Sequence, residues 1–194
     1  MQLRRWGWVG RTVICCMALV GGLTSSNAQT FVGLGLGGGL PTTGYADTSP
    51  YMLAGELQYG VHRYCNWWPV ATLTYGHFAT RDTVSITTPT YPDAFMIQGN
   101  LRWFPWGSTI TPLYASLGTG ISVVLGDDNE SVVGLPGTAE VGYLIHYVDP
   151  CCDWFVTLSL RYTASNMLRD LDRPHLSSLS GMIHFNLPLG GGGR

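Results

Sequence analysis

Residues 51–63 read YMLAGELQYGVHR, and apolar and polar side chains alternate along this stretch. Leu53 and Leu57 fall on one face of an extended chain, and Glu56 and Gln58 fall on the other. Alternation with a period of two predicts a β-strand with one apolar and one polar face. A tilted strand of about ten residues is long enough to cross a bilayer. The stretch therefore predicts a membrane-spanning strand whose apolar face contacts lipid and whose polar face points into the protein.

The same alternation recurs in seven further segments of the chain. They are Phe31–Leu40, Val70–Thr80, Phe95–Phe104, Leu113–Leu125, Thr138–Val148, Trp154–Thr163 and Leu176–Leu187. An even number of alternating segments separated by turn residues is typical of closed membrane barrels. The sequence therefore predicts an all-β fold, an eight-stranded antiparallel up-and-down transmembrane β-barrel.

The connections between these segments are of two alternating kinds. Three are short, Tyr64–Pro69, Pro105–Pro112 and Asp149–Asp153, and four are longer and polar, Pro41–Pro50, Arg81–Ala94, Gly126–Gly137 and Ala164–His175. Outer-membrane barrels have short periplasmic turns and longer external loops. This asymmetry places both chain termini in the periplasm. The tryptophans that follow residue 28 all fall at the short-turn ends, where they predict a periplasmic aromatic girdle of Trp67, Trp68, Trp103, Trp106 and Trp154.

The first residues have the features of a secretory signal peptide. Arg4, Arg5 and Arg11 precede or border an apolar run from Thr12 to Leu23, and small residues follow at Ser26 and Ala28. The apolar run is shorter than the roughly 20 residues that a spanning helix needs. We therefore expect residues 1–28 to be cleaved, residues 29–188 to form an outer-membrane barrel, and residues 189–194 to form a flexible Gly-rich tail.

The composition agrees with an exported membrane protein. The chain has 194 residues, of which 45% are hydrophobic and only 11% are charged, whereas soluble domains carry about 25% charged residues. Its 10 basic residues are all Arg, and removal of the three in residues 1–28 leaves seven basic against 12 acidic residues, a net charge near −5. This acidic balance excludes a basic nucleic-acid surface, and the low charge predicts outer-membrane lipid as the main partner.

The polar faces of the strands are expected to point into the barrel, because a charge facing lipid near the midplane costs about 2–4 kcal/mol. An eight-stranded interior is just wide enough for side chains to fill. We therefore expect a structural cluster, in which Glu56 and Glu140 pair with Arg102 or Arg161, and no open pore, catalytic site, cofactor or metal. A catalytic or proton-relay role for the Glu and His residues is the alternative. The predicted lumen cluster comprises Glu56, Gln58, His62, Asn100, Arg102, Glu140, His146, Arg161 and His184.

Three cysteines follow the signal peptide, and all three fall in predicted periplasmic turns. They are Cys65, Cys151 and Cys152, and the periplasm is an oxidising compartment. A disulfide from Cys65 to Cys151 or Cys152, a vicinal bridge and free thiols all remain open. No ligand spacing supports a zinc site.

Three stretches resemble the OmpA- and OmpX-like family of small outer-membrane barrels. They are FVGLGLGGGL at residues 31–40, ELQYG at residues 56–60 and MIHF at residues 182–185, and the resemblance of pattern extends from Phe31 to Leu187. It implies a Gram-negative cell envelope, insertion by the barrel-assembly machinery and no enzymatic activity. It also implies a structural or surface-interaction role, in adhesion or envelope integrity, through external loops that could meet an extracellular partner.

Two alternatives belong to other functional classes. Lipid A deacylases of the PagL type are also eight-stranded barrels, with a His-x-Ser-Asn motif in a late strand. Here the corresponding residues are Thr163-Ala164-Ser165-Asn166, and without the histidine base the serine is not activated. A soluble, secreted lipocalin-like barrel would bury the apolar faces around a small hydrophobic ligand and expose the polar faces.

Overall fold

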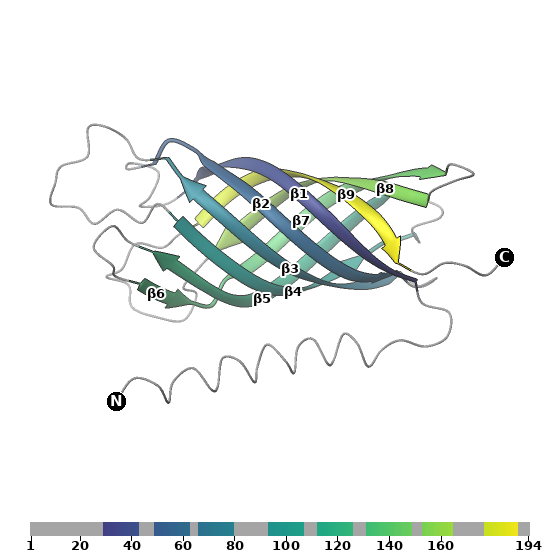
Figure 1. The fold of residues 1–194 in the computed structure, drawn as a ribbon, viewed down its shortest axis with the longest axis horizontal. Helices are drawn as coiled ribbons and strands as arrows, with labels where there is room; N and C mark the ends of the chain where they lie inside the picture. The colour runs from purple at the N-terminus through teal and green to yellow at the C-terminus, as the bar shows by residue number, and fades with distance from the viewer. Residues whose placement is uncertain are drawn as a thin grey trace, which may run out of the picture.

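The computed structural model contains one closed antiparallel sheet that forms a barrel (Figure 1). It describes residues 29–42, 49–62, 66–79, 93–106, 112–125, 131–148, 153–164 and 177–189. The strands are β1 (Gln29–Pro41), β2 (Met52–His62), β3 (Trp67–Phe78), β4 (Asp93–Trp103), β5 (Leu113–Leu125), β6 (Ser131–Gly134), β7 (Gly137–Val148), β8 (Asp153–Ala164) and β9 (Ser177–Leu189). No helix in the described part of the chain has the length and hydropathy needed to cross a membrane.

The predicted eight-stranded architecture is confirmed. Except for β6 and β7, consecutive strands pair with each other, and β1 pairs with β9 to close the barrel. The short β6 and the longer β7 both pair with β5 in one common register, since Ser122 faces Gly134 and Thr119 faces Gly137. Together they form a single sixth strand that is interrupted at Leu135 and Pro136. Pro136 has no N–H to donate to the ladder, although its carbonyl still accepts bonds from Gly120 N at 3.3 Å and Thr119 Oγ1 at 3.1 Å.

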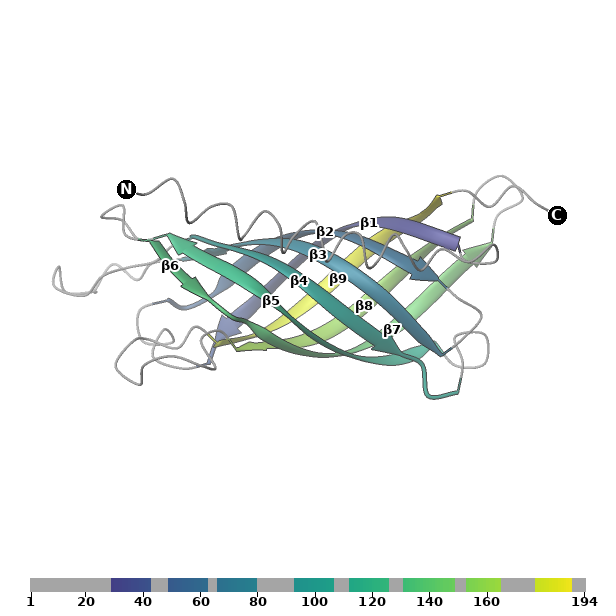
Figure 2. The ribbon, with the colours of Figure 1, turned by 90° about the horizontal axis from the view of Figure 1, so that it is seen from below.

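The pairing registers fix the shape of the barrel. A path along paired residues leads from Phe31 through Gly60, Val70, Asn100, Gly118, Thr138, Thr163 and Ser178, and it returns to β1 at Pro41. The path is therefore displaced by ten residues along β1 after one circuit. With about 3.3 Å per residue and about 4.8 Å between strands, this displacement tilts the strands by about 40°. The strong tilt is visible in Figure 2, and it lies within the roughly 35–45° of membrane barrels.

Side chains are partitioned in the opposite way to those of a soluble protein. On β3 the burial alternates residue by residue, with Thr72 and Thr74 buried while Leu73 and Tyr75 are 45% and 41% exposed. On β1 and β5, Leu36 and Leu117 are about 70% exposed. The lipocalin-like alternative requires the reverse partition and is therefore wrong.

Inward-facing glycines on β1 allow side chains from both neighbouring strands to meet above the backbone. Gly35 is paired with Glu56 on one side and with His184 on the other. A Cβ atom at Gly35 would overlap the imidazole of His184, and one at Gly33 would overlap Asn186. The glycine-rich sequence of β1 is thus required by close packing inside a narrow barrel.

Most strand boundaries differ from the expected ones by one to three residues, and three of the differences have a structural explanation. Residues 131–134 form β6, although Gly126–Gly137 was expected to be a loop, because they extend the ladder beside β5. β3 begins earlier than expected, because Trp67, Trp68 and Pro69 pair with β4. Pro69 is tolerated there because it lies beyond the last residue pair between β2 and β3, so β2 does not need an N–H from it. Leu189 ends β9 and pairs with Thr30, so the barrel extends one residue past its expected end.

Several expectations concern parts of the chain outside the described residues. These are the signal peptide at residues 1–28, the tail from residue 190, Cys65, Cys151 and Cys152, and most of the long external loops. The side chains of His62 and His146 also lie outside the described part.

Replacing Gly35 with Val should destabilise the barrel, because the new side chain must displace the buried ring of His184. Overpacking of this kind costs about 1–3 kcal/mol. Gly181→Val is the matched control, since a Cβ atom there meets nothing within 4 Å. Urea unfolding in detergent, followed by Trp fluorescence, should give a lower midpoint for Gly35→Val only. Equal midpoints for the two variants would show that β1 tolerates an inward side chain.

Candidate functional site

Arg161, on β8, joins two carboxylates in the middle of the barrel. Its Nη1 and Nη2 atoms donate to Glu56 on β2, the Nη2 bond measuring 3.0 Å, and its Nε donates to Glu140 on the neighbouring β7 at 2.7 Å. All three side chains are at most 6% exposed. A guanidinium has its donors in a fixed fork that fits carboxylates. Arg161 therefore uses both edges of its fork and connects opposite walls of the barrel.

His184 and Thr74 also hydrogen-bond to Glu56, and Thr157 contacts the other nitrogen of His184. His184 Nε2 lies 3.0 Å from Glu56 Oε1, and its Nδ1 lies 3.3 Å from Thr157 Oγ1. Thr74 donates a further bond to Glu56 Oε2 at 2.7 Å. The carboxylate is thus surrounded by donors, which is how a buried charge is stabilised.

Arg102 is bound much more loosely than Arg161. Its Nη2 lies 3.5 Å from Gln58 Oε1 and 3.8 Å from Glu140 Oε1, and its guanidinium carbon stacks 4.2 Å from the ring centre of Tyr114. Its Nε and Nη1 have no hydrogen-bond partner among the described residues. Arg102 therefore balances the second carboxylate mainly through a long ion pair and ring stacking.

Uncharged hydrogen bonds surround the four charges. Asn100 donates to Thr72 and accepts from Thr138, both at 3.1 Å. Gln58 donates to Asn186 across Gly33 of β1. Two Glu and two Arg give the described interior no net charge when His184 is neutral. The layer is a polar network with gaps, because the amide of Gln98 and two nitrogens of Arg102 are buried without a hydrogen-bond partner among the described residues.

Two apolar layers close the barrel on either side of this network. At the short-turn end, rings lie edge to face or tilted, with 5.1 Å between the centroids of Phe31 and Phe155 and 4.5 Å between those of Trp68 and Phe104. This layer comprises Phe31, Trp68, Val70, Phe104, Tyr114, Leu144 and Phe155. The layer at the long-loop end comprises Met52, Ala54, Phe78, Ala94, Val124 and Met182. The cavity there measures about 20 Å³, which is room for about one water molecule.

The structure places most of the expected cluster together. Glu56, Gln58, Arg102, Glu140, Arg161 and His184 are all buried in the interior, and Asn100 joins the network through its hydrogen bonds. The sequence left open which arginine each carboxylate pairs with. In the structure both Glu56 and Glu140 pair with Arg161, and Arg102 makes only a long ion pair of 3.8 Å with Glu140.

Four of the five tryptophans expected in the aromatic girdle face outward, but Trp68 does not. Trp67, Trp103 and Trp106 face outward with 49%, 40% and 60% exposure, and Trp67 stacks on Trp103. Trp154 also points outward, beside Phe185. Trp68 is only 2% exposed and lies in the apolar layer, because it follows Trp67 on the same strand and so points to the opposite face.

The sequence reasoning missed the two apolar layers. Their signal was present, because Phe31, Phe104 and Phe155 occupy the same strand parity as the polar lumen residues near the strand ends. Three further partners of the cluster were not predicted, namely Thr74, Thr157 and Asn186. The alternating pattern places them on the inward face, but it does not show which inward residues lie at the same level of the barrel as the charges.

The described residues contain no group of three or more His, Cys, Asp or Glu side chains arranged to hold a metal ion. A hydroxyl, an imidazole and a carboxylate do stand in line at Thr157, His184 and Glu56. Thr157 and His184 are 0% exposed and Glu56 is 4% exposed. A substrate could therefore not reach this trio without opening the barrel.

The closed sheet, its tilt, the apolar outer surface and the sealed polar interior together define a class. The protein is an eight-stranded transmembrane β-barrel of the outer-membrane type.

Three solved structures are similar to the chain, each at low sequence identity. Neisserial surface protein A has 14% sequence identity and a TM-score of 0.49, over 81% of this chain and 97% of that protein. The outer membrane protein OprG from Pseudomonas aeruginosa has 12% identity and a TM-score of 0.42, over 85% of this chain and 98% of that one. The designed protein TMB2.3 has 14% identity and a TM-score of 0.40, over 86% and 100%. No family model and no curated protein sequence matches the chain.

The two arginines should differ in their contribution to stability. Arg161→Met leaves two buried carboxylates without their main partner, and breaking a buried pair costs about 3–5 kcal/mol. Arg102→Met should cost clearly less, because Glu140 keeps its bonds from Arg161 and Tyr114. Unfolding free energies measured in detergent check the order. An equal loss for both variants would contradict the central position of Arg161.

Proposed function

We propose that this protein is a non-conducting barrel of the outer membrane that supports surface-exposed loops, with a role in adhesion or envelope integrity. The observation that carries the proposal is the sealed interior. A charge-paired layer lies between two apolar layers, so the described side chains obstruct a route for solutes through the barrel. A rigid, closed wall with long loops at one end is suited to presenting those loops to an extracellular partner.

The orientation in the membrane follows from the asymmetry of the connections. The short connections and the start of β1 lie at the end where Trp67, Trp103, Trp106 and Trp154 face outward. Aromatic residues at this rim fit a membrane interface. We therefore place this end, with both termini, in the periplasm and the longer loops outside the cell.

The deacylase alternative receives little support from the geometry. Thr163, at the position of the family's histidine, points into the barrel and is 6% exposed. A hydroxyl cannot serve as the general base that would activate Ser165. A structural role also accounts for the buried Thr157, His184 and Glu56, because His184 contacts both of the others and so provides each with a hydrogen-bond partner.

Epitope tags test the orientation. A tag within residues 84–88, in a long connection, should be accessible to antibody on intact cells, whereas a tag after Arg194 should need permeabilised cells. Gel migration that shifts on boiling serves as the control that each tagged protein is a folded barrel. Surface access of the C-terminal tag would overturn the orientation and the role given to the loops.

Conductance tests the sealed interior. The purified barrel in planar bilayers should show no stepwise single-channel currents, because side chains fill the lumen. An open porin inserted under the same conditions is the positive control. Regular channel openings from the unmodified protein would contradict the proposal.

A further inference from the structure

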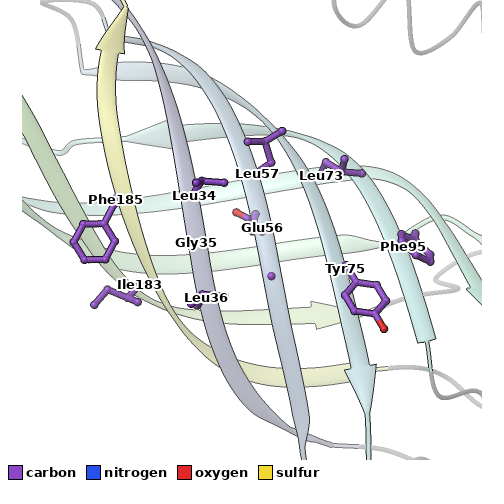
Figure 3. A pocket seen from close by; sticks show the side chains of 11 residues that line it. Leu34, Gly35, Leu36, Glu56, Leu57, Leu73, Tyr75, Phe95, Ile183 and Phe185 are labelled. Atoms are coloured by element: carbon purple, nitrogen blue, oxygen red, sulfur yellow. The ribbon is translucent and has the colours of Figure 1, made fainter.

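The described part of the barrel contains spaces of two kinds. On the outer wall, two grooves of about 520 and 510 Å³ have mostly apolar walls, and Figure 3 shows the larger one beside Leu34, Leu57 and Phe95. Their similar size and apolar walls are expected of a surface that lipid covers. The inner cavity of about 20 Å³ is different, because a buried hydroxyl without a partner lies at its wall.

This hydroxyl belongs to Ser122 of β5, which faces Met96 of β4 across the two strands. Both residues line the inner cavity. Directly opposed residues on one face of an antiparallel pair have Cβ atoms about 4.5–5.5 Å apart. Ser122 is 2% exposed, and its hydroxyl has no hydrogen-bond partner among the described residues. A buried donor that lacks an acceptor is destabilising, and here it lies next to a thioether.

A second buried donor follows along β4. Gln98 occupies the next inward position after Met96 and is 2% exposed, and neither its amide nitrogen nor its amide oxygen is bonded among the described residues. Gly120 stands opposite Gln98 on β5, so that position supplies no side chain to bond the amide. Met96 therefore lies beside two donors, although a thioether sulfur is only a weak acceptor.

We propose that Met96 is a site of oxidation by peroxides, and that Ser122 and Gln98 accommodate the resulting sulfoxide. The sulfur donates an electron pair to one oxygen of hydrogen peroxide. The S–O bond forms as the O–O bond breaks, and the second oxygen leaves as water with both protons. Sulfur is thereby oxidised by two electrons and the peroxide is reduced. The sulfoxide oxygen needs a donor and the space of one oxygen atom, and the cavity beside Ser122 provides both.

The other two methionines that the structure describes lack this environment. Met52 and Met182 are 5% and 4% exposed, whereas Met96 is half-buried and easier for a small oxidant to reach. Met52 lines the same cavity, but its sulfur lies over β3, two strands away from Ser122. Met182 faces another unpartnered serine, Ser159 on β8, but its sulfur lies over β1, on the opposite side of β9. A sulfoxide in an apolar core ordinarily disrupts packing, so Met96 is the position where it is tolerated.

Peptide mass spectrometry tests the order of oxidation. The full barrel, folded in detergent, is treated with dilute hydrogen peroxide, quenched and digested with trypsin. Arginines separate the three methionines in the sequence, so a different tryptic peptide reports each one. Met96 should become the sulfoxide several-fold faster than Met52 and Met182. Equal rates, or no oxidation of Met96 until the barrel is unfolded, would overturn the site.

Urea unfolding of the reduced and the oxidised protein tests the role of the donors. Oxidation should leave the midpoint of the unmodified protein unchanged or higher, because the sulfoxide oxygen accepts bonds from Ser122 and Gln98. It should lower the midpoint of Ser122→Ala. Ser159→Ala, which removes an unpartnered serine beside Met182, is the matched control and should behave as the unmodified protein does.

One outcome would assign the two donors to an ordered water only and so overturn the proposal. It is an equal loss of midpoint on oxidation in the unmodified protein and in Ser122→Ala. Met96→Leu should show no change in midpoint on oxidation, and a loss in that variant would place the relevant sulfur elsewhere. Mobility that changes on boiling shows that each variant is a folded barrel, and Gln98→Leu replaces Ser122→Ala if the latter does not fold.

Discussion

The guanidinium of Arg161 is the interaction on which the interior depends, because it connects β8 to Glu56 on the far side of β1 and β9 and to Glu140 on the adjacent β7. Each carboxylate alone would be costly to bury, and the guanidinium between them is the main charge that stabilises both. The neutral partners follow from this arrangement: Thr74 and His184 occupy the remaining positions around Glu56, and Tyr114 does so for Glu140. Cross-barrel charge pairing thus determines which strands carry hydroxyl, imidazole and ring side chains at this depth.

The narrowness of the barrel explains both the glycines of β1 and the apolar layers. Inward side chains of β2 and β9 can contact each other across β1 only where β1 has no inward side chain, as at Gly33 and Gly35. The same limited space means that a few rings, such as Trp68 and Phe104, are sufficient to close one end. Water is thereby kept from the ion pairs, which strengthens the attraction between Arg161 and its partners.

Strand number, side-chain parity and the identity of the lumen charges were predictable from sequence, because a period of two requires only that each strand keep its register. Glu56, Arg102, Glu140 and Arg161 could be assigned to the interior on this basis. The choice of Arg161 over Arg102 as the shared partner was not predictable, since it depends on how the strands are staggered around the barrel. The girdle assignment of Trp68 was wrong, because alternation along a strand makes one of two adjacent side chains face inward, whatever the preference of the indole for a membrane interface. The strand segment before Pro136 was not predicted, because the polar run at residues 126–130 and the proline itself are typical of a loop.

The outer surface must meet two conditions that the interior does not. It must be apolar around the whole circumference, and its shape must be filled by flexible lipid rather than by fixed neighbours. Leucine and aromatic side chains satisfy the first condition at most outward positions, including Leu57, Leu73 and Phe95. A glycine such as Gly55 satisfies it as well, but it leaves a space that no protein atom fills. Inside the barrel a glycine is filled by its neighbours, as His184 fills the space above Gly35. Because no described protein atom fills the outward space, it can be filled only by the surrounding medium.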